Sequence, residues 1–193
     1  MRPMAATQSQ RTSWLPALVL LGAAVLGYAV LPGVSRRVSP SARMLGEPAP
    51  DFSLPVFHGG DAGSRIRLSA LQGNIVILDF WASWCKPCQA QARILSELAS
   101  RHTGGNVMFV GVNTADNPER AAAFAEAHQL PYPSVLDEGD IVANVYGASS
   151  LPTLVVIDAA GKVSDVTLGV LSAEEIDEAI RVAGAAATSK PPG

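Results

Sequence analysis

The chain has 193 residues, of which 48% are hydrophobic, and it carries a net charge of −3. This is enough for one domain with an ordinary packed core, so its two cysteines are not needed as a disulfide framework. The first 43 residues contain five arginines and no acid, whereas 17 acids stand against nine bases from Met44 onward. So acidic a folded region argues against a nucleic-acid partner.

A segment of 24 residues without a charged side chain, 12–35, lies near the N-terminus. As a helix it would extend about 36 Å, enough to cross the roughly 30 Å hydrocarbon core of a bilayer. Trp14 and Tyr28 stand toward its ends, where interfacial aromatic side chains are common. We therefore predict a transmembrane anchor over 14–34. The N-terminus over residues 1–13 is cytoplasmic only on the strength of the family resemblance given below.

The alternative for this segment is a signal peptide that is removed. No clear small-x-small cleavage site follows it, and no cysteine is there to be lipidated, so the uncleaved anchor is preferred. Two arginines before the span and three after it leave its orientation undecided. We predict a linker over residues 35–46, which are rich in Pro, Ser and Arg, a folded domain over 47–186 and a disordered tail over 187–193.

Strands and helices alternate in the first half of the predicted domain. The apolar, β-branched run at 74–82 is typical of a strand buried on both faces, and residues 85–102 follow at helical spacing. A second strand is predicted at 106–113. The cap Asn117 then opens a helix over 118–128.

The second half continues with a short strand at 134–136 and a short helix that ends near Gly147. Runs at 153–158 and 162–169 flank a turn and predict a hairpin. A capping box at 172–175 starts a final helix, which we expect to end near residue 186. These elements predict an α/β fold with a central mixed β-sheet flanked by helices.

Cys85 and Cys88 stand directly after the buried strand, at the start of an amphipathic helix. Unpaired N–H groups and the helix dipole favour a thiolate there, which predicts a redox pair. We expect Cys85 to be an exposed nucleophile that attacks a substrate disulfide, and Cys88 to resolve the mixed disulfide. Lys86 adds a nearby positive charge and Pro87 suits the first helical turn; together these two residues tune the reduction potential.

Two other interpretations of the cysteine pair are weaker. A structural disulfide across so short a loop would remove little entropy from the unfolded chain. A structural zinc site needs four ligands, but there is no second cysteine pair, and His58, His102 and His128 are scattered over a predicted loop and two helix ends. We therefore expect no metal and no cofactor.

The sequence DFWASWCKPC at 79–88 resembles the active-site stretch of the thioredoxin superfamily. APDFSL at 49–54, LSALQGNIVILDFWASWC at 68–85 and YGASSLPTLVVIDAAGKV at 146–163 are similar to a narrower group. With the predicted anchor, they resemble the membrane-tethered TlpA/ResA/CcmG-type thiol–disulfide oxidoreductases, on the redoxin or AhpC/TSA branch. The resemblance covers about residues 47–183 and implies a thioredoxin fold behind an N-terminal transmembrane helix.

The resemblance also implies roles for single residues. Leu151, Pro152 and Thr153 match the family's cis-proline segment, which lies against the cysteines and pairs with a substrate's backbone. The alternative for this proline is an ordinary trans bond at the start of a strand. Trp84 matches the tryptophan before the reactive cysteine, an apolar rim for docking, whereas Trp81 is assigned to the core.

Asp79 interrupts an apolar run six residues before Cys85. Burial of a lone carboxylate is costly, so its pKa should be raised. In thioredoxins an acid at the matching place is taken to accept the proton of the resolving cysteine, whereas the tethered relatives commonly have Asn. The lysine that thioredoxins often place near this acid corresponds to Gly111 here. We predict that Asp79 accepts the proton of Cys88; the alternative is an acid that reaches water at the strand end.

The implied enzyme is monomeric and is held in the bacterial inner membrane by a single span, with its catalytic domain in the periplasm or extracytoplasmic space. It would reduce protein disulfides, and the resemblance suggests apocytochrome c among its substrates and a membrane thiol protein as its electron donor. The Lys-Pro dipeptide is compatible with a reductant but does not decide the direction of electron flow.

Two other functions remain as alternatives. A thiol peroxidase of the peroxiredoxin type shares APDFSL, but its reactive cysteine follows a threonine in a proline-rich loop, where this chain has WCKPC. A thioredoxin-like copper chaperone tends to have a wider cysteine spacing and a histidine near the hairpin, and residues 130–170 contain no histidine.

Overall fold

The computed structural model of the chain describes residues 43–61 and 63–188. The predicted N-terminus, the anchor at 14–34 and most of the linker lie outside these residues, so they stay predictions together with the domain boundaries. Within the described ranges, no helix is long and apolar enough to cross a membrane.

The described residues form a seven-stranded mixed sheet with the order β2-β1-β5-β4-β3-β6-β7. Its central strands β3, β4 and β5 are parallel, whereas β6 and β7 on one side and β1 and β2 on the other pair antiparallel. The strands are β1 (Ser53–His58), β2 (Arg65–Arg67), β3 (Ile75–Trp81), β4 (Val107–Asn113), β5 (Ser134–Leu136), β6 (Thr153–Ile157) and β7 (Val163–Leu168). The predicted mixed sheet and its hairpin are confirmed.

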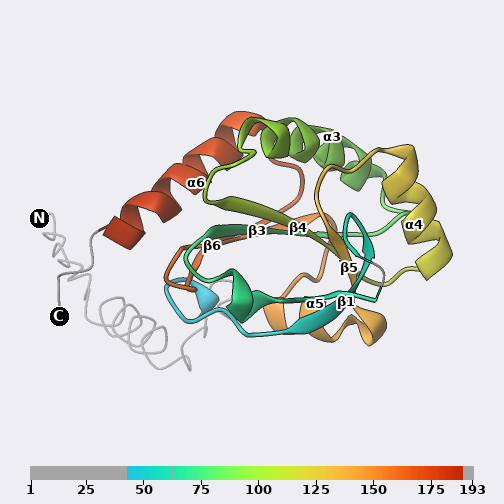
Figure 1. Ribbon diagram of the computed structural model, residues 1–193, viewed down its shortest axis with the longest axis horizontal. Helices are drawn as coiled ribbons and strands as arrows, with labels where there is room; N and C mark the ends of the chain where they lie inside the picture. Colours follow the sequence, from blue (N-terminus) through green and yellow to red (C-terminus); the bar gives the residue numbers. More distant parts are fainter. Residues whose placement is uncertain (1–42, 62, 189–193) are drawn as a thin grey trace, which may run out of the picture. The chain divides into compact units, whose positions relative to one another are not determined.

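Helices cover both faces of this sheet. Figure 1 shows α3, α4 and α6 along one side and α5 along the other. The helical elements are the 3-10 turn η1 (Leu68–Leu71), α3 (Lys86–Arg101), α4 (Pro118–Ala127), the 3-10 turn η2 (Glu138–Asp140), α5 (Ile141–Tyr146) and α6 (Ala173–Thr188). The last helix ends at Thr188, two residues past its expected end.

The central strand β3 divides the core into two layers. Successive side chains of a strand point to opposite faces, so Ile77 and Trp81 pack with α3, α4 and α6, while Leu78 and Phe80 pack with α5. Every residue of β3 is buried because both faces are covered, which explains the apolar run that predicted this strand.

Local capping determines where two helices begin. The Asn117 side chain accepts a hydrogen bond from the backbone N–H of Arg120 (3.0 Å) at the start of α4. Ser172 and Glu175 bond reciprocally to each other's backbone N–H (2.8 and 3.3 Å) at the start of α6. Both caps were predicted from the sequence, because a cap depends only on residues three positions apart.

The first hairpin of the domain was not predicted. β1 and β2 are short edge strands whose residues are at most half-buried, so they lack the apolar run that reveals β3. His58 is consequently the last residue of β1 and does not lie in a loop, and its Nε2 lies 2.8 Å from the carbonyl oxygen of Leu130.

Candidate active site

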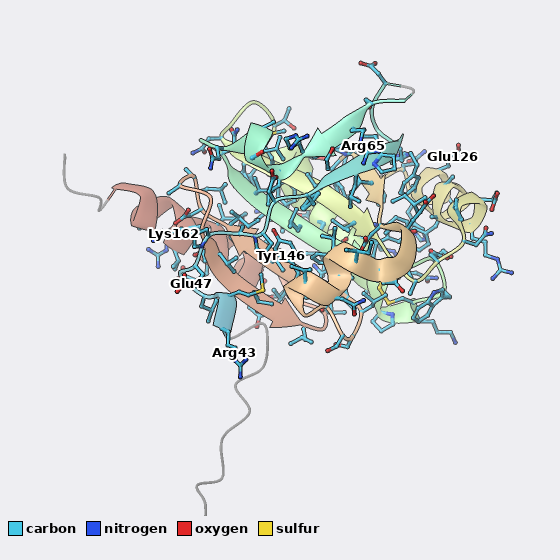
Figure 2. The ribbon with its side chains drawn as sticks, turned by 90° about the horizontal axis from the view of Figure 1, so that it is seen from below. Arg43, Glu47, Arg65, Glu126, Tyr146 and Lys162 are labelled. Carbon is cyan, nitrogen blue, oxygen red and sulfur yellow. A yellow bond between two sulfur atoms is a disulfide. The ribbon has the colours of Figure 1, made fainter. Side chains whose placement is uncertain are left out.

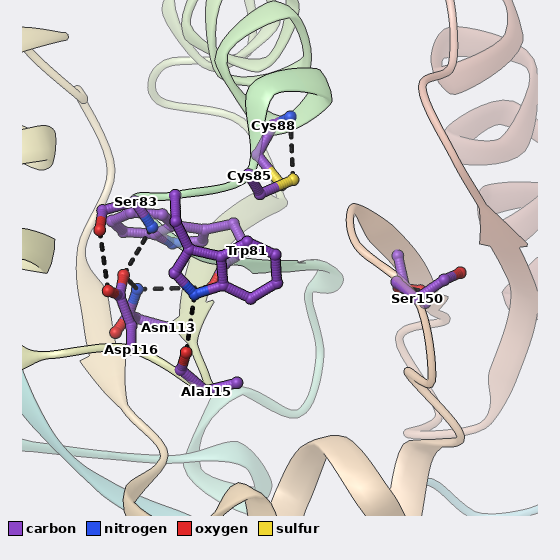
Figure 3. Close-up of a disulfide and its surroundings, with 10 residues drawn as sticks. Trp81, Ser83, Cys85, Cys88, Asn113, Ala115, Asp116 and Ser150 are labelled. Atoms are coloured by element: carbon purple, nitrogen blue, oxygen red, sulfur yellow. Dashed lines mark hydrogen bonds between the residues drawn. A yellow bond between two sulfur atoms is a disulfide. The ribbon is translucent and has the colours of Figure 1, made fainter.

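The two cysteines form a disulfide at the N-terminus of α3 (Figure 3). Cys85 is the N-cap of this helix, and its Sγ accepts a hydrogen bond from the backbone N–H of Cys88 (3.2 Å). Pro87 lies in the first turn, as predicted, and both it and Lys86 are exposed. A Cys85 thiolate would occupy the same cap position, where helical N–H groups and the helix dipole stabilise negative charge.

The expected exposure of Cys85 is not found in this oxidised form. The residue is 3% exposed, and both cysteines belong to the buried cluster between α3 and the sheet. The cause is the bond itself: Cys88 lies one turn deeper on the buried side of α3, so the Cys85 side chain must turn inward to reach it.

The segment Leu151–Thr153 leads into β6, the strand next to β3. The Leu151–Pro152 bond is cis, so the trans alternative is wrong, and Leu151 packs against the cluster that contains both cysteines. The Pro152 carbonyl accepts from Gly169 N–H (2.8 Å), and Thr153 pairs with Phe80 of β3. The segment is therefore held between β3 and β7 at the active-site end of the sheet.

Trp84 presents an exposed indole beside the disulfide. Its side chain is held although the residue is 60% exposed, because Nε1–H donates to the carbonyl of Ala115 (2.7 Å). Ala115 has a φ of +50°, which is unfavourable for a residue with a Cβ. Asp140 stabilises this conformation: its Oδ1 accepts from Ala115 N–H and from Thr114 Oγ1 (both 2.6 Å).

A second aspartate joins the same loop to the residue before Trp84. The Asp116 carboxylate accepts from the backbone N–H and hydroxyl of Ser83 and from the Asn113 amide, as Figure 3 shows. Burial raises the pKa of Asp116, but these hydrogen bonds outweigh burial and hold it below its usual value. Asp116 and Asp140 thus hold the loop whose Ala115 carbonyl accepts the hydrogen bond from Trp84, and so fix the orientation of this indole. The sequence analysis missed both residues.

Asp79 lies on the α3 side of β3, between Ile77 and Trp81. It is 3% exposed, so the alternative of an acid that reaches water is wrong. Burial raises its pKa to about 7, and the interaction with the Tyr132 hydroxyl opposes part of that increase. A raised pKa was predicted for Asp79 and agrees with its burial. Gly111, which the resemblance aligns with the lysine of thioredoxins, pairs with Asp79 in the sheet.

Gln91 is a buried polar residue of the site that the sequence analysis missed. It lies on α3 three residues after Cys88, and its Oε1 accepts from the backbone N–H of Leu171 (2.8 Å). Its Nε2 has no hydrogen-bond partner among the described residues. A glutamine at the buried spacing of an amphipathic helix was the available signal, because such positions are otherwise apolar.

The described residues contain no group of three or more His, Cys, Asp or Glu side chains that could hold a metal ion. The three histidines lie at separate places: His58 ends β1, while His102 and His128 are the C-cap residues of α3 and α4. His102 lies 3.2 Å from the Asp177 carboxylate on α6.

Comparison with known proteins agrees with this geometry. Residues 45–166 match the AhpC/TSA family. The chain belongs to this family.

Two curated proteins are similar to most of the chain. The thiol-disulfide oxidoreductase ResA of Geobacillus thermodenitrificans is 33% identical over 171 residues, which are 89% of this chain and 95% of the relative. That of Geobacillus kaustophilus is 32% identical over 88% of this chain and 94% of the relative.

A solved structure from Chlorobium tepidum, described as a thiol:disulfide interchange protein DsbE, has a TM-score of 0.66 at 28% identity. The likeness covers 72% of this chain and 98% of that structure. The fold is therefore thioredoxin-like, and the chain is a ResA/DsbE-like thiol–disulfide oxidoreductase, an enzyme that acts on protein disulfides.

We predict that Asp140→Gly will weaken protein substrate binding without impairing the chemistry. Glycine adopts the φ of +59° at this position freely. The substitution therefore removes only the two hydrogen bonds that Asp140 accepts from Thr114 and Ala115. KM for a disulfide-bonded protein should rise about 3- to 10-fold, the effect of losing one ordering contact, while kcat and the reaction with a small aromatic disulfide stay unchanged. Glu138→Gln, which removes an exposed acid of η2, is the matched control. An equal KM in both variants would contradict this role for Asp140.

Proposed function

We propose that this domain reduces disulfides in extracytoplasmic proteins, with Cys85 and Cys88 as the electron-carrying pair and Asp79 as the proton acceptor. One arrangement carries the proposal: a disulfide at the start of α3, a cis-proline segment that packs against the buried cluster containing both cysteines, and a buried carboxyl group on the α3 side of the sheet. An exposed indole beside the pair supplies an apolar surface for docking.

Electron transfer would proceed in two displacements. A substrate docks against Trp84 and the backbone of Leu151–Thr153, and the Cys85 thiolate attacks one sulfur of the substrate disulfide. A mixed disulfide forms, and the released substrate thiolate takes a proton from water. Cys88 then gives its proton to the Asp79 carboxylate and attacks Cys85 Sγ, which releases the second substrate thiolate.

The oxidised enzyme that results is the form described here. Two electrons and two protons from a thiol donor regenerate the dithiol, so the cycle as a whole moves one disulfide from the substrate to the donor. A membrane-embedded thiol protein is our proposal for this donor. It is supported by the family resemblance and by the predicted anchor.

The pKa of Asp79 suits it to accept a proton in this cycle. A carboxyl group with a pKa of about 7 is about half ionised at neutral pH, and a cysteine thiol ordinarily ionises near pH 8.5. Transfer of the proton from the Cys88 thiol to the Asp79 carboxylate therefore costs little free energy, which is compatible with general base catalysis. An exposed aspartate would be too weak a base for this step.

Apocytochrome c is the substrate class that we propose, and a single-span anchor at 14–34 is our proposal for the location. The support is the family resemblance and the uncharged 24-residue segment. The alternative functions are less well supported, since both cysteines are committed to one another and neither a peroxidatic threonine nor a nearby histidine ligand accompanies them.

The anchor can be tested in cells that express the full chain. Because the span is apolar and unbroken by charge, the chain should stay in the membrane after carbonate washing, and protease should digest its domain in spheroplasts but not in intact cells. A soluble periplasmic product that begins after the span would contradict an anchor and identify a cleaved signal peptide.

The roles of the two cysteines predict opposite outcomes for their variants. Cys88→Ser should accumulate a mixed disulfide with its substrate because the resolving thiol is gone, whereas Cys85→Ser should form no adduct. Non-reducing electrophoresis and mass spectrometry would detect the adduct, with an oxidised Cys-x-x-Cys-His peptide as the test substrate. An adduct on Cys85→Ser alone would reverse the assignment.

Asp79→Asn should slow resolution of the mixed disulfide by on the order of 10²-fold near pH 7.5, the usual contribution of a general base. The wild-type rate should rise as the pH passes about 7, because the carboxylate is the acceptor and the acid form is not. In the variant, the rate should rise only as Cys88 ionises by itself, so the deficit shrinks above about pH 8.5.

Stopped-flow fluorescence over pH 6–9 would measure these rates. Asp158→Asn is the matched control, since Asp158 is also buried but follows β6 at the far end of the sheet. Identical pH profiles for wild type and Asp79→Asn would remove Asp79 from the mechanism.

A further inference from the structure

Of the buried side-chain polar atoms that have no hydrogen-bond partner within residues 43–61 and 63–188, four belong to residues of β3 or to residues at and just before β5. They are Asp79 Oδ1, Trp81 Nε1, Tyr132 OH and Ser134 Oγ. Unpaired polar atoms are expensive in a protein core and are rare singly. A group of four at one place therefore calls for a functional explanation.

The sheet register brings these groups together. Asp79, Gly111 and Ser134 are aligned across the parallel strands β3, β4 and β5, so the three positions share one face. Trp81 follows two residues after Asp79 on that face and packs in the same cluster as Tyr132. Tyr132, two residues before Ser134, lies near enough to Asp79 for each group to affect the pKa of the other, although its hydroxyl makes no hydrogen bond with the described residues in this oxidised form.

Gly111 is what allows this arrangement. A Cβ at this position would lie 2.5 Å from Ser134 Oγ and 2.9 Å from Trp81 Nε1, closer than such atoms approach in proteins. A lysine or any other side chain is therefore excluded from the place beside Asp79. Neutral polar groups surround the carboxyl group instead.

Among the residues that the structure describes, no group with a formal charge contributes to the pKa shift of Asp79. β4 and β6 contribute Gly111 and Leu154, which do not ionise, and α3 contributes Cys88, which is disulfide-bonded in this form. Tyr132 is the only ionisable side chain of the described residues that interacts with Asp79, and burial raises the pKa of this tyrosine well above its usual value. The phenol therefore stays protonated and can donate a hydrogen bond at any pH at which the enzyme works.

We propose that Tyr132 is the positioning residue of the proton acceptor: its hydroxyl donates to the Asp79 carboxylate that forms before Cys88 is deprotonated, and Gly111 keeps the intervening space open. The inference rests on the proposed role of Asp79. A hydroxyl suits both states of the carboxyl group, because it donates to the carboxylate and accepts from the acid. Tyr132 would thus replace the lysine of thioredoxins by a neutral group.

The test is the titration of Asp79 in the full chain, followed by 13C NMR of its carboxyl carbon. Tyr132→Phe removes one hydroxyl and keeps the ring, so the carboxylate loses a donor and the Asp79 midpoint should rise by about 0.5 to 1 pH unit. The pH profile of mixed-disulfide resolution should shift by the same amount. In an Asp79→Asn background, Tyr132→Phe should leave that profile unchanged.

Tyr146→Phe is the matched control. Tyr146 is a second buried tyrosine, but it belongs to the α5 layer on the opposite face of the sheet, toward the viewer in Figure 2, and its hydroxyl donates to the Pro50 carbonyl (2.7 Å). Its loss should leave the Asp79 midpoint in place. Equal midpoints in wild type and Tyr132→Phe, or equal shifts in both tyrosine variants, would overturn the proposal.

A second measurement keeps the test valid should Tyr132→Phe fail to fold. Fluorotyrosine at position 132 is nearly the same size as tyrosine and is a stronger donor, so it should lower the Asp79 midpoint, opposite to the effect of phenylalanine. An unmoved midpoint would again overturn the role of Tyr132. The proposed function fails by a different result, namely unchanged resolution rates in Asp79→Asn.

Discussion

The register of β3 in the centre of the sheet is the constraint on which this active site depends. It turns Asp79 toward α3 and, six residues later, leaves Cys85 at the N-terminus of that helix. Because strand side chains alternate between the faces, a slip of one residue would move Asp79 into the α5 layer, away from both cysteines. The pairing of β3 with β4 and β6 along its length holds this register.

Negative charge is handled in two ways at this end of the sheet. Asp116, in the loop after β4, and Asp140, the last residue of η2, each accept more than one hydrogen bond and hold the loop that orients Trp84. Asp79 lacks such donors, so burial keeps its carboxyl group close to the point of ionisation at neutral pH. The hydrogen bonds that Asp116 and Asp140 accept thus give these two aspartates a structural role. Asp79 has few hydrogen-bond donors around it, and this leaves its pKa in a range that is useful for proton transfer.

Both cysteines are buried in the oxidised site. Cys85 turns inward to reach Cys88, and the cis-proline segment packs beside the pair. What the enzyme offers a partner in this state is the indole of Trp84, whose orientation depends on a backbone conformation at Ala115 that the fold stabilises through Asp140. The surface that would receive a partner and the sulfur atoms that react are therefore held by different contacts.

The sequence alone determined the features that depend on neighbouring residues: the buried run of β3, the caps at Asn117 and Ser172, and the cysteine pair at a helix start. The raised pKa of Asp79 could also be predicted, because a lone carboxylate within an apolar run is expected to be buried. Only the tertiary structure decided that Tyr132 and Ser134 meet beside that carboxylate, that Asp140 supports Trp84, and that Cys85 is buried when oxidised. These contacts join residues up to 55 positions apart in the sequence, and strand order and register, which no local pattern encodes, bring them together.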